Sequence, residues 1–400
     1  MNVILDNVYC VGTLNPNLRI FDIEMCTEHG TSYNSYLVCG TNETAIIDAN
    51  HEAFAGEWLA GIEGVLNGKE PSYLILNHTE PDHSSSLDAC LAQYPSITVV
   101  CSASAAINIK NITNRQDLAI QVVKNGDSID LGGLTLEFYS APFLHWPDSM
   151  FTWLPEHQIA FTCDFLGTHY CEPRIFDRTL SYHDAFMTSF EAYYQAIMSP
   201  FAPWVRKGLA ILDDLEPKIV ATSHGPVLTK GSSLEKCIDL YREWSVEQPS
   251  SPERIALFYC SAYGYTQALA EHIAVGISTA LPEAKVSLYD LVGANLAHLG
   301  TELNRSTAFL IGSPTVNKAA LPTVWNLLAH IDAINIVKRP VALFGSYGWS
   351  GEALPQLAAH LTTLKAKVFD TQLSVRFAPS EADLAAAEEF GKEFALSLLA

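Results

Sequence analysis

Long hydrophobic segments are absent from this sequence, in which no apolar run reaches the ~18 residues that a membrane-spanning helix needs. The start of the chain, from Met1 to Thr13, has neither a basic region nor a long apolar stretch of the kind found in secretory signals. These two absences argue against a membrane protein and against a secreted one. We therefore expect a soluble protein of the cytoplasm.

Basic residues are scarce, with 23 Lys and Arg against 44 Asp and Glu, which gives a formal net charge of −21. Binding to nucleic acid or to an anionic membrane requires patches of Lys and Arg, so we expect neither partner. The acidic balance is typical of a well-solvated surface and is compatible with neutral substrates and small redox partners. Hydrophobic residues make up 48% of the chain, which is ample for large buried cores.

Paired cysteines are also missing, because none of the nine cysteines belongs to a Cys-x-x-Cys motif. This absence excludes an iron–sulfur cluster or a rubredoxin-type site of the usual spacing. Several cysteines lie in apolar runs, such as Cys101 in TVVCS and Cys260 in ALFYC. We interpret them as reduced core residues, which fits a reducing compartment.

A break in the pattern lies between Val246 and Arg254, where two prolines, two serines and charged residues follow one another. We predict a first domain at 1–246, a linker at 247–254 and a second domain at 255–400. In the first domain, β-like runs followed by polar residues predict a layered α/β fold with its site at strand ends. These runs lie at 36–40, 44–50, 73–77, 97–102, 134–142, 159–164 and 219–225, with helical stretches at 53–67 and 205–215.

The second domain has a more regular pattern, in which apolar runs alternate with amphipathic helices. Strand–helix alternation predicts a doubly wound parallel sheet, and its length suits about five strands and five helices. The apolar runs lie at 255–260, 285–291, 307–315, 340–346 and 366–372.

A metal site is predicted by seven His, Asp and Glu residues that follow β-like runs. An isolated His145 or His224 is more often an ordinary hydrogen-bonded histidine, and only the joint pattern indicates a metal. Three carboxylates supply hard oxygen donors and no cysteine belongs to the set, which favours iron, while zinc and manganese remain compatible. The predicted ligands are His78, Glu80, Asp82 and His83, in one motif, together with His145, Asp164 and His224.

Three loops of the second domain indicate a bound cofactor with a phosphate group and a ring. The first loop joins a strand to a helix, where backbone N–H groups bind phosphate, although alone it is typical of any βα turn. Glycines of the other two loops allow close approach to a ring, and Tyr347 or Trp349 offers a stacking face. No G-x-G-x-x-G dinucleotide motif is present. The predicted cofactor-binding residues are Ser261, Tyr263, Gly264, Tyr265, Thr266, Ser313, Pro314, Thr315, Val316, Asn317, Ser346, Tyr347, Gly348, Trp349 and Gly351.

The chain resembles the flavodiiron proteins, of the rubredoxin:oxygen oxidoreductase type, over essentially its whole length. In the first domain the resemblance is carried by GTSYNSYLV, H-x-E-x-D-H, FLHWPDSM and ATSHG, and in the second by SxYGxT, SPTxN and FGSYGWSG. It implies an αββα sandwich of the metallo-β-lactamase type followed by a flavodoxin-like domain with FMN. Glu80 stands where zinc hydrolases of that fold have a histidine.

The resemblance also implies roles for the ligands and an activity. His78, Glu80 and His145 would hold one iron, the other three would hold the second, and Asp164 would bridge the pair. FMN would relay electrons to this diiron centre, which would reduce O2 to water, NO to N2O, or both. An external donor is implied, namely rubredoxin, an NADH-linked reductase or coenzyme F420H2. A head-to-tail homodimer, or a dimer of such dimers, is expected.

Two alternatives remain at this point: a binuclear zinc hydrolase fused to a flavodoxin-like electron carrier, and a pure electron carrier with a structural metal. Four further residues accompany the motifs. His169 and Tyr193 are hypothesised to orient ligands, and Trp146 to pack beside a partner chain's flavin or in the core. Asp48 fits a fold-supporting carboxylate better than a ligand.

Overall fold

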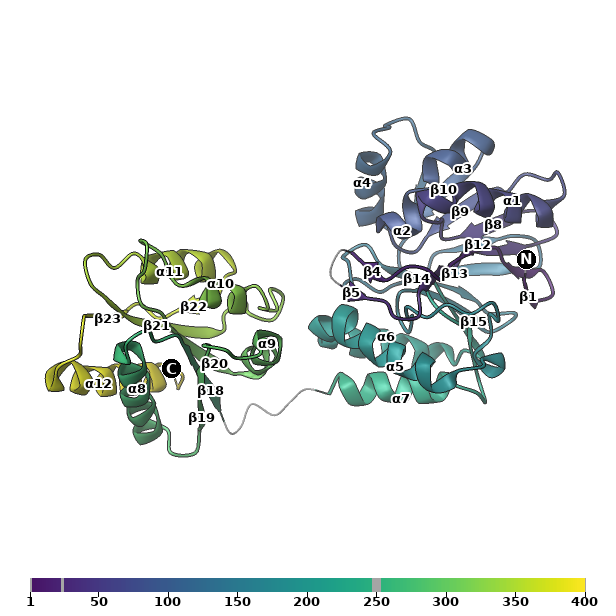
Figure 1. Ribbon diagram of the computed structural model, residues 1–400. Helices are drawn as coiled ribbons and strands as arrows, with labels where there is room; N and C mark the ends of the chain where they lie inside the picture. The colour runs from purple at the N-terminus through teal and green to yellow at the C-terminus, as the bar shows by residue number, and fades with distance from the viewer. Residues whose placement is uncertain (1, 23–24, 247–252, 400) are drawn as a thin grey trace. The chain divides into compact units, whose positions relative to one another are not determined.

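The computed structural model describes residues 2–22, 25–246 and 253–399 (Figure 1). The chain divides into two compact units, Met1–Glu247 and Gln248–Ala400. Most of the predicted linker at 247–254 lies outside the described residues, and Arg254 already belongs to the first strand of the second unit. Within the described part of the chain, no helix is long and apolar enough to cross a membrane.

The first unit contains two sheets that pack face to face. The strand order is β1-β2-β7-β8-β9-β10-β11 in one sheet and β12-β13-β14-β15-β16-β17 in the other. The strands of the first sheet are β1 Asn2–Leu5, β2 Val8–Cys10, β7 Tyr36–Cys39, β8 Thr44–Ile47, β9 Tyr73–Leu76, β10 Thr98–Cys101 and β11 Ile120–Val122. Those of the second sheet are β12 Ser128–Asp130, β13 Thr135–Ser140, β14 Met150–Leu154, β15 Ile159–Cys163, β16 Ile219–Thr222 and β17 Leu228–Thr229.

Helices cover the outer face of each sheet, so the unit has the predicted αββα layers (Figure 1). On the first sheet lie α1 Ala55–Leu66, α3 Leu87–Gln93 and α4 Ala103–Ile112. On the second sheet lie α5 His183–Tyr193, α6 Ala202–Leu215 and α7 Leu234–Trp244. Short elements complete the unit: α2 Pro81–Ser84 and the hairpin strands β3 Thr13–Asn15, β4 Ile20–Phe21, β5 Met25–Cys26 and β6 Thr31–Tyr33.

The central strands are apolar throughout because both of their faces are buried. In β9, Ile75 packs into the core between the sheets, whereas Leu74 and Leu76 pack beneath the helices. Phe138 and Phe161 fill the inter-sheet core from the opposite side. Alternate side chains of a strand point to opposite faces, so a strand covered on both faces is expected to be apolar at every position.

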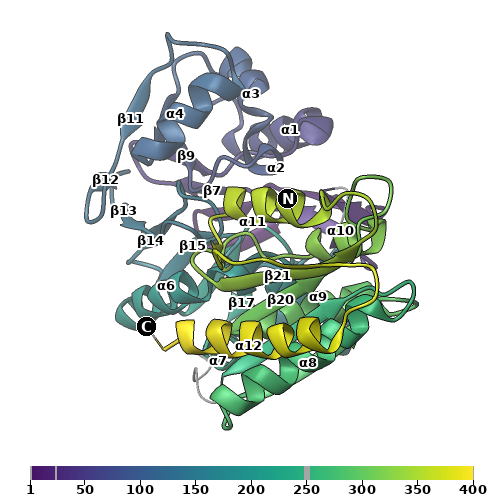
Figure 2. The same cartoon turned by 90° about the vertical axis from the view of Figure 1, so that its left-hand side faces the viewer.

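The second unit is the predicted doubly wound sheet, with strand order β19-β18-β20-β21-β22 and with β23 also paired to β21, all in parallel (Figure 2). Helices α8 and α12 pack on one face of this sheet and α9, α10 and α11 on the other. The strands are β18 Arg254–Tyr259, β19 Lys285–Asp290, β20 Ala308–Gly312, β21 Pro340–Tyr347, β22 Lys367–Val368 and β23 Leu373–Arg376. The helices are α8 Tyr265–Ala280, α9 Leu296–Arg305, α10 Pro322–Leu328, α11 Ala353–Thr363 and α12 Glu381–Ser397.

The prediction of one strand at 366–372 is wrong, because the chain forms two short strands with a break between them. After β22, the Phe369 N–H still donates to Val341 O at 2.7 Å, and the Phe369 ring packs against Phe390 and Phe394 of α12. The polar residues 370–372 then leave the sheet, and β23 returns to the other end of β21. The second short strand therefore ends beside the loop that follows β21.

Candidate metal centre and flavin site

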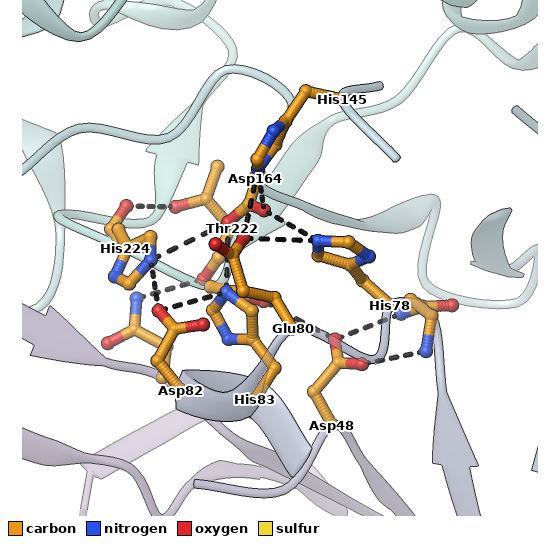
Figure 3. A network of polar contacts seen from close by, with 12 residues as sticks. Asp48, His78, Glu80, Asp82, His83, His145, Asp164, Thr222 and His224 are labelled. Atoms are coloured by element: carbon orange, nitrogen blue, oxygen red, sulfur yellow. Dashed lines mark hydrogen bonds and ion pairs between the residues drawn. The ribbon is translucent and has the colours of Figure 1, made fainter. Parts of the chain in front are cut away.

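The seven predicted ligands converge on one point at the edge of the inter-sheet core (Figure 3). Strand β9 ends in the loop that carries two of them, α2 carries two more, and the remaining three follow β13, β15 and β16. All are buried except for one half-buried imidazole. His78 and Glu80 belong to the loop after β9, and Asp82 and His83 belong to α2. His145, Asp164 and His224 follow β13, β15 and β16, respectively.

Asp164 lies between two pairs of imidazoles and turns one oxygen toward each pair. Its Oδ2 is 3.5 Å from His78 Nε2 and 3.6 Å from His145 Nε2. Its Oδ1 is 3.0 Å from His83 Nε2 and 3.6 Å from His224 Nε2. This division of one carboxylate between two sets of nitrogen atoms is the arrangement that a bridging ligand of a two-metal centre requires.

A second carboxylate completes each set. Glu80 Oε2 is 3.3 Å from His78 Nε2 and 3.0 Å from His145 Nε2. With Asp164, these residues place four ligand atoms within 4.8 Å of one another. Each ligand contributes one atom to a compact polyhedron of nitrogen and oxygen donors, which suits a divalent transition metal.

The other set consists of Asp82, His83 and His224, whose ligand atoms also lie within 4.8 Å of one another. Asp82 Oδ2 is 3.0 Å from His224 Nε2 and 3.3 Å from His83 Nε2. Both sets use the Nε2 atoms of their histidines, so the inward-facing atoms are of the same kind throughout.

Buried polar atoms without hydrogen bonds show that this cluster fits metal ions. Both oxygens of Asp82 and Oδ2 of Asp164 are buried and have no hydrogen-bond partner among the described residues. Leaving a buried carboxylate oxygen unsatisfied is costly, so a cation at the centre would remove this penalty. The residues present therefore fit a pair of metal ions.

The charges of the cluster favour cations as well. Burial disfavours the imidazolium form of His83, but the Asp82 and Asp164 carboxylates outweigh it and raise its pKa to about 9. Burial likewise opposes ionisation of Asp164, but the surrounding histidines, first of all His83, lower its pKa well below 3.8. Asp164 thus stays ionised, and metal ions would take the place of the protons on the imidazoles.

Hydrogen bonds behind the ligands hold the histidines in orientation. His78 Nδ1 lies 3.3 and 3.4 Å from the two oxygens of Asp148, a fully buried residue. Asp148 Oδ2 also accepts from the backbone N–H of Thr79 at 2.8 Å and from its hydroxyl at 2.6 Å. On the other side, His224 Nδ1 donates to Ser32 O at 2.7 Å. Such contacts fix the tautomer that points Nε2 toward the metal.

Asp148→Asn is therefore expected to weaken iron binding about 10- to 100-fold, the usual effect of removing an outer partner of a metal-bound histidine. An amide has a single acceptor oxygen, so an oxygen that accepts from both Thr79 donors leaves the amide NH2 group facing the donor His78 Nδ1. The measurement is an anaerobic Fe²⁺ titration of metal-free protein against a competing chelator. Asp177→Asn is the control, because Asp177 is equally buried and its hydrogen bonds go to Arg178, Thr229 and Ser233, not to a ligand. Equal affinities in the two variants would contradict the role of Asp148.

Asp48 supports the fold beside the centre, as predicted. It accepts hydrogen bonds from Asn77 N at 2.7 Å, Asn77 Nδ2 at 3.1 Å and Ser223 Oγ at 3.3 Å (Figure 3). Burial raises its pKa to about 6 in spite of these bonds. It connects the end of β8 to the ends of β9 and β16, and candidate ligands follow the latter two strands.

His169 and Tyr193 lie next to the centre. The His169 ring is 4.7 Å from the ring of His224 and 5.0 Å from that of Tyr193, and His169 Nδ1 is 2.9 Å from Thr31 Oγ1. Burial and the neighbouring His224 lower the pKa of His169 well below 6.5, so its imidazole is neutral. Trp146 is half-buried and packs edge-on to His78, with ring centroids 5.1 Å apart.

Two residues near the centre were not anticipated from the sequence. Cys163 Sγ lies within 4.8 Å of the ligand atoms of His83 and Asp164, so a thiol does lie beside the set. Burial raises its pKa well above 9.0, so it is a neutral thiol and a poor metal ligand. Asp22, in the β4–β5 hairpin, is an exposed residue beside Glu80, and its partial desolvation together with the Glu80 carboxylate raises its pKa to about 6.

The predicted cofactor loops meet at the carboxyl ends of β18, β20 and β21. Ser346 joins all three loops, because its hydroxyl is 3.0 Å from Thr266 Oγ1 and its carbonyl accepts from Thr315 N at 3.0 Å. Gly264 has a φ of 81° at the start of α8, a conformation that favours glycine. This helix has 16 residues, and its N-terminus faces the loop where a phosphate is expected.

Aromatic side chains at these loops have little to pack against. Trp349 is 92% exposed and Tyr263 is 84% exposed. Large exposed aromatic groups beside a helix N-terminus fit a planar ring that carries a phosphate, so the residues present suit FMN. The two units thus define a class of proteins that combine a two-metal centre with a flavodoxin-like unit.

Comparisons with known proteins agree with this class. Residues 31–225 match the family described as ODP family beta lactamase, and residues 257–391 match the flavodoxin family. The chain is 48% identical to the flavo-diiron protein FprA2 of Clostridium acetobutylicum over 396 residues, 99% of each chain. It is 30% identical to the anaerobic nitric oxide reductase flavorubredoxin of Shigella dysenteriae over 98% of this chain and 81% of that one.

Solved structures give the same result. The rubredoxin oxygen:oxidoreductase of Desulfovibrio gigas matches with a TM-score of 0.70 and 27% identity, covering 100% of this chain and 98% of that one. The protein is a member of the flavodiiron family, whose members carry a diiron centre and, in their flavodoxin domain, FMN.

Proposed function

We propose that this protein reduces O2 to water, NO to N2O, or both, at a pair of iron ions with electrons relayed by FMN. The observation that carries the proposal is the division of the Asp164 carboxylate between two imidazole pairs, each with its own second carboxylate. Two relatives are named for these reactions, the nitric oxide reductase of Shigella dysenteriae and the oxygen oxidoreductase of Desulfovibrio gigas. Glu80 and the flavin loops argue against the zinc hydrolase alternative.

In this proposal, one iron would be held by His78, Glu80 and His145. The second iron would be held by Asp82, His83 and His224, and Asp164 would bridge the two. When bound, the reduced irons hold two electrons and reduced FMN two more, so four are available for O2 and two suffice to couple two NO. The protein fixes the donor atoms and excludes water. Tyr193 is buried at the edge of the centre, and burial raises its pKa well above 10.0, so its hydroxyl keeps its proton.

The purified protein is expected to contain about two irons and one FMN per chain, because seven candidate ligands cluster in the first unit and three candidate cofactor loops meet in the second. Elemental analysis of protein produced without added zinc, combined with a flavin absorption spectrum, checks this composition. Active protein that contains zinc in place of iron would refute the diiron assignment.

The activity itself is tested by measuring consumption of O2 and of NO by the same preparation with one electron donor. We expect at least one turnover to depend on both iron and FMN. Absence of both turnovers in protein with full iron and FMN would refute the proposed function. The ratio of the two rates then identifies the physiological substrate.

We further propose that electrons come from an external donor, either rubredoxin, an NADH-linked reductase or coenzyme F420H2. A cytoplasmic location is supported by the nine cysteines, all of which are unpaired. The assignment of the donor is tested by reducing the bound FMN with each candidate under anaerobic conditions and comparing the rates.

The working unit in this proposal is a head-to-tail homodimer, or a dimer of such dimers, in which FMN of one chain serves the irons of the other. Support comes from aromatic side chains beside both sites. Phe201 lies 6.3 Å from the His145 ring, and the 37% exposed Phe143 packs against Trp204 at 5.0 Å. At the flavin loops, Trp349 is almost fully exposed. Exposed aromatic groups that border a functional site are typical of surfaces that bind a partner.

A further inference from the structure

A fourth segment, Arg376–Phe377 at the end of β23, lies against the third flavin loop. Strand β23 runs parallel to β21 and pairs Arg376 with Tyr347, so both strands end at the same edge of the sheet. The Phe377 N–H donates to Tyr347 O at 2.8 Å. The sequence motifs did not include this segment, because it belongs to no glycine-bearing loop.

Contacts of this segment fix the backbone of the loop at Gly348. Arg376 Nε donates to Gly348 O at 3.0 Å. A Cβ atom at Gly348 would lie only 3.0 Å from Cε1 of the Phe377 ring, so the ring and the glycine are in close contact. Phe377 itself has a φ of 59°, a conformation that phenylalanine rarely adopts, and it is held there by the hydrogen bond to Tyr347.

The guanidinium group of Arg376 lies over the Phe377 ring, with Cζ 5.9 Å from the ring centroid. Among the residues that the structure describes, no Asp or Glu makes an ion pair with Arg376, although the chain has 44 acidic residues. Another cation at these loops, Lys318, lies near Glu352, whose pKa is lowered first by a hydrogen bond from Ser350 and to a smaller extent by the charge of Lys318. A guanidinium is always charged, so a fixed positive charge stands beside the ring-binding loop.

We propose that Arg376 is a positioning residue of the flavin site that holds the loop at Gly348 and stabilises the reduced, anionic form of bound FMN by its charge. This inference rests on FMN binding, which is part of the proposed function, but not on the reaction at the metal centre. Charge placed near the ring of a flavin is a recognised way to tune it. A positive charge binds the electron-rich reduced ring more tightly than the neutral oxidised ring, which raises the midpoint potential.

The test is potentiometric titration of the flavin in full-length holoprotein, followed by its visible absorption. For Arg376→Gln we expect reduced FMN to bind about tenfold more weakly relative to oxidised FMN, which for two electrons lowers the midpoint potential by about 30 mV. Arg376→Lys keeps the charge and is expected to retain most of the wild-type potential. Arg254→Gln is the control, since this exposed arginine starts β18 at the opposite end of the sheet and its removal changes the net charge equally.

Several outcomes would overturn the inference. A potential of Arg376→Gln equal to that of Arg254→Gln shows that the charge does not reach the flavin. If Arg376→Gln fails to retain FMN, the Arg376→Lys variant decides. A wild-type midpoint potential in Arg376→Lys supports the role of the charge, whereas equal loss of FMN from both variants shows that Arg376 has a purely structural role. Because flavin potential is measured without O2 or NO, a protein without reductase activity leaves this test intact.

Discussion

Asp164→Ala is expected to lose both irons and both reductase activities while it keeps FMN. Among the residues that the structure describes, only the Asp164 oxygens approach all four inward-facing imidazole nitrogens, at 3.0 to 3.6 Å. Removal of a residue that only hydrogen-bonds to a metal ligand lowers metal affinity or activity about 10- to 100-fold. Removal of a shared ligand should therefore lower iron affinity by more than ~100-fold. FMN binding should persist because its loops belong to the other compact unit.

The measurement is iron content by elemental analysis and FMN content by absorbance in the same samples, with O2 and NO consumption. Asp164→Asn provides a variant of the same shape, and its melting temperature separates ligand loss from misfolding. Asp117→Ala is the control, since the Asp117 side chain is 76% exposed and pairs with Arg115, far from the candidate ligands in the sequence. A full iron pair in Asp164→Ala would show that another group bridges the metals.

The clustering of the seven candidate ligands could be predicted from the sequence, because five of them follow strands directly, the other two lie on the short helix after β9, and all belong to residue types with metal chemistry. The buried residues that contact these ligands from outside the cluster could not be predicted in this way. Asp148 lies within FLHWPDSM, but nothing local indicates that its carboxylate meets His78, 70 positions earlier in the chain. The position of the Cys163 thiol could not be predicted either. Cys163 precedes Asp164 in the sequence, but the direction of its side chain depends on the turn that follows β15.

The ends of the strands differ from prediction for a physical reason. The apolar runs at 159–164 and 219–225 suggested longer strands than β15, which ends at Cys163, and β16, which ends at Thr222. Cys163 has a φ of 49° and follows a register shift against β16, so the chain leaves the sheet before Asp164. The departure lets the carboxylate turn into the centre, and a pattern of apolar residues carries no signal for it.

The flavin loops were predicted from their glycines and hydroxyl side chains, whereas the segment at β23 was not. Its position depends on the break after β22, where the predicted strand at 366–372 divides. Only the pairing of β23 with the far end of β21 brings Arg376 to Gly348. Long-range pairing of this kind is decided by packing on α12 and not by the local sequence.

A flavin-free variant follows from the first loop. Gly264→Asp combined with Thr266→Asp is expected to abolish FMN binding, because it places two negative charges where a phosphate should bind. Gly264 also has a φ of 81°, and Thr266 is fully buried, so both positions tolerate substitution poorly. Iron content should be unchanged, since the ligands lie in the other unit. Absorbance at the flavin bands and elemental analysis check the two halves of this expectation.

A metal-free variant is its counterpart. His83→Ala combined with His224→Ala removes both imidazoles of the second set, which leaves Asp82 as its only member. This protein should keep FMN but lose iron from that set, and it should be inactive. Each double variant therefore carries one functional site, and neither can turn over alone.

Heterodimers of the two variants decide whether electrons cross between chains. If FMN of one chain serves the irons of the other, each heterodimer contains one complete pair, and about half of the wild-type activity per dimer should return, as twofold symmetry requires. Differently tagged chains are co-expressed, heterodimers are purified through both tags, and their iron and FMN contents are measured before turnover. A heterodimer of each variant with the wild-type chain controls for damage to the interface. Heterodimers with the expected iron and FMN that remain inactive, beside active controls, would show that transfer runs within a chain and that the head-to-tail proposal is wrong.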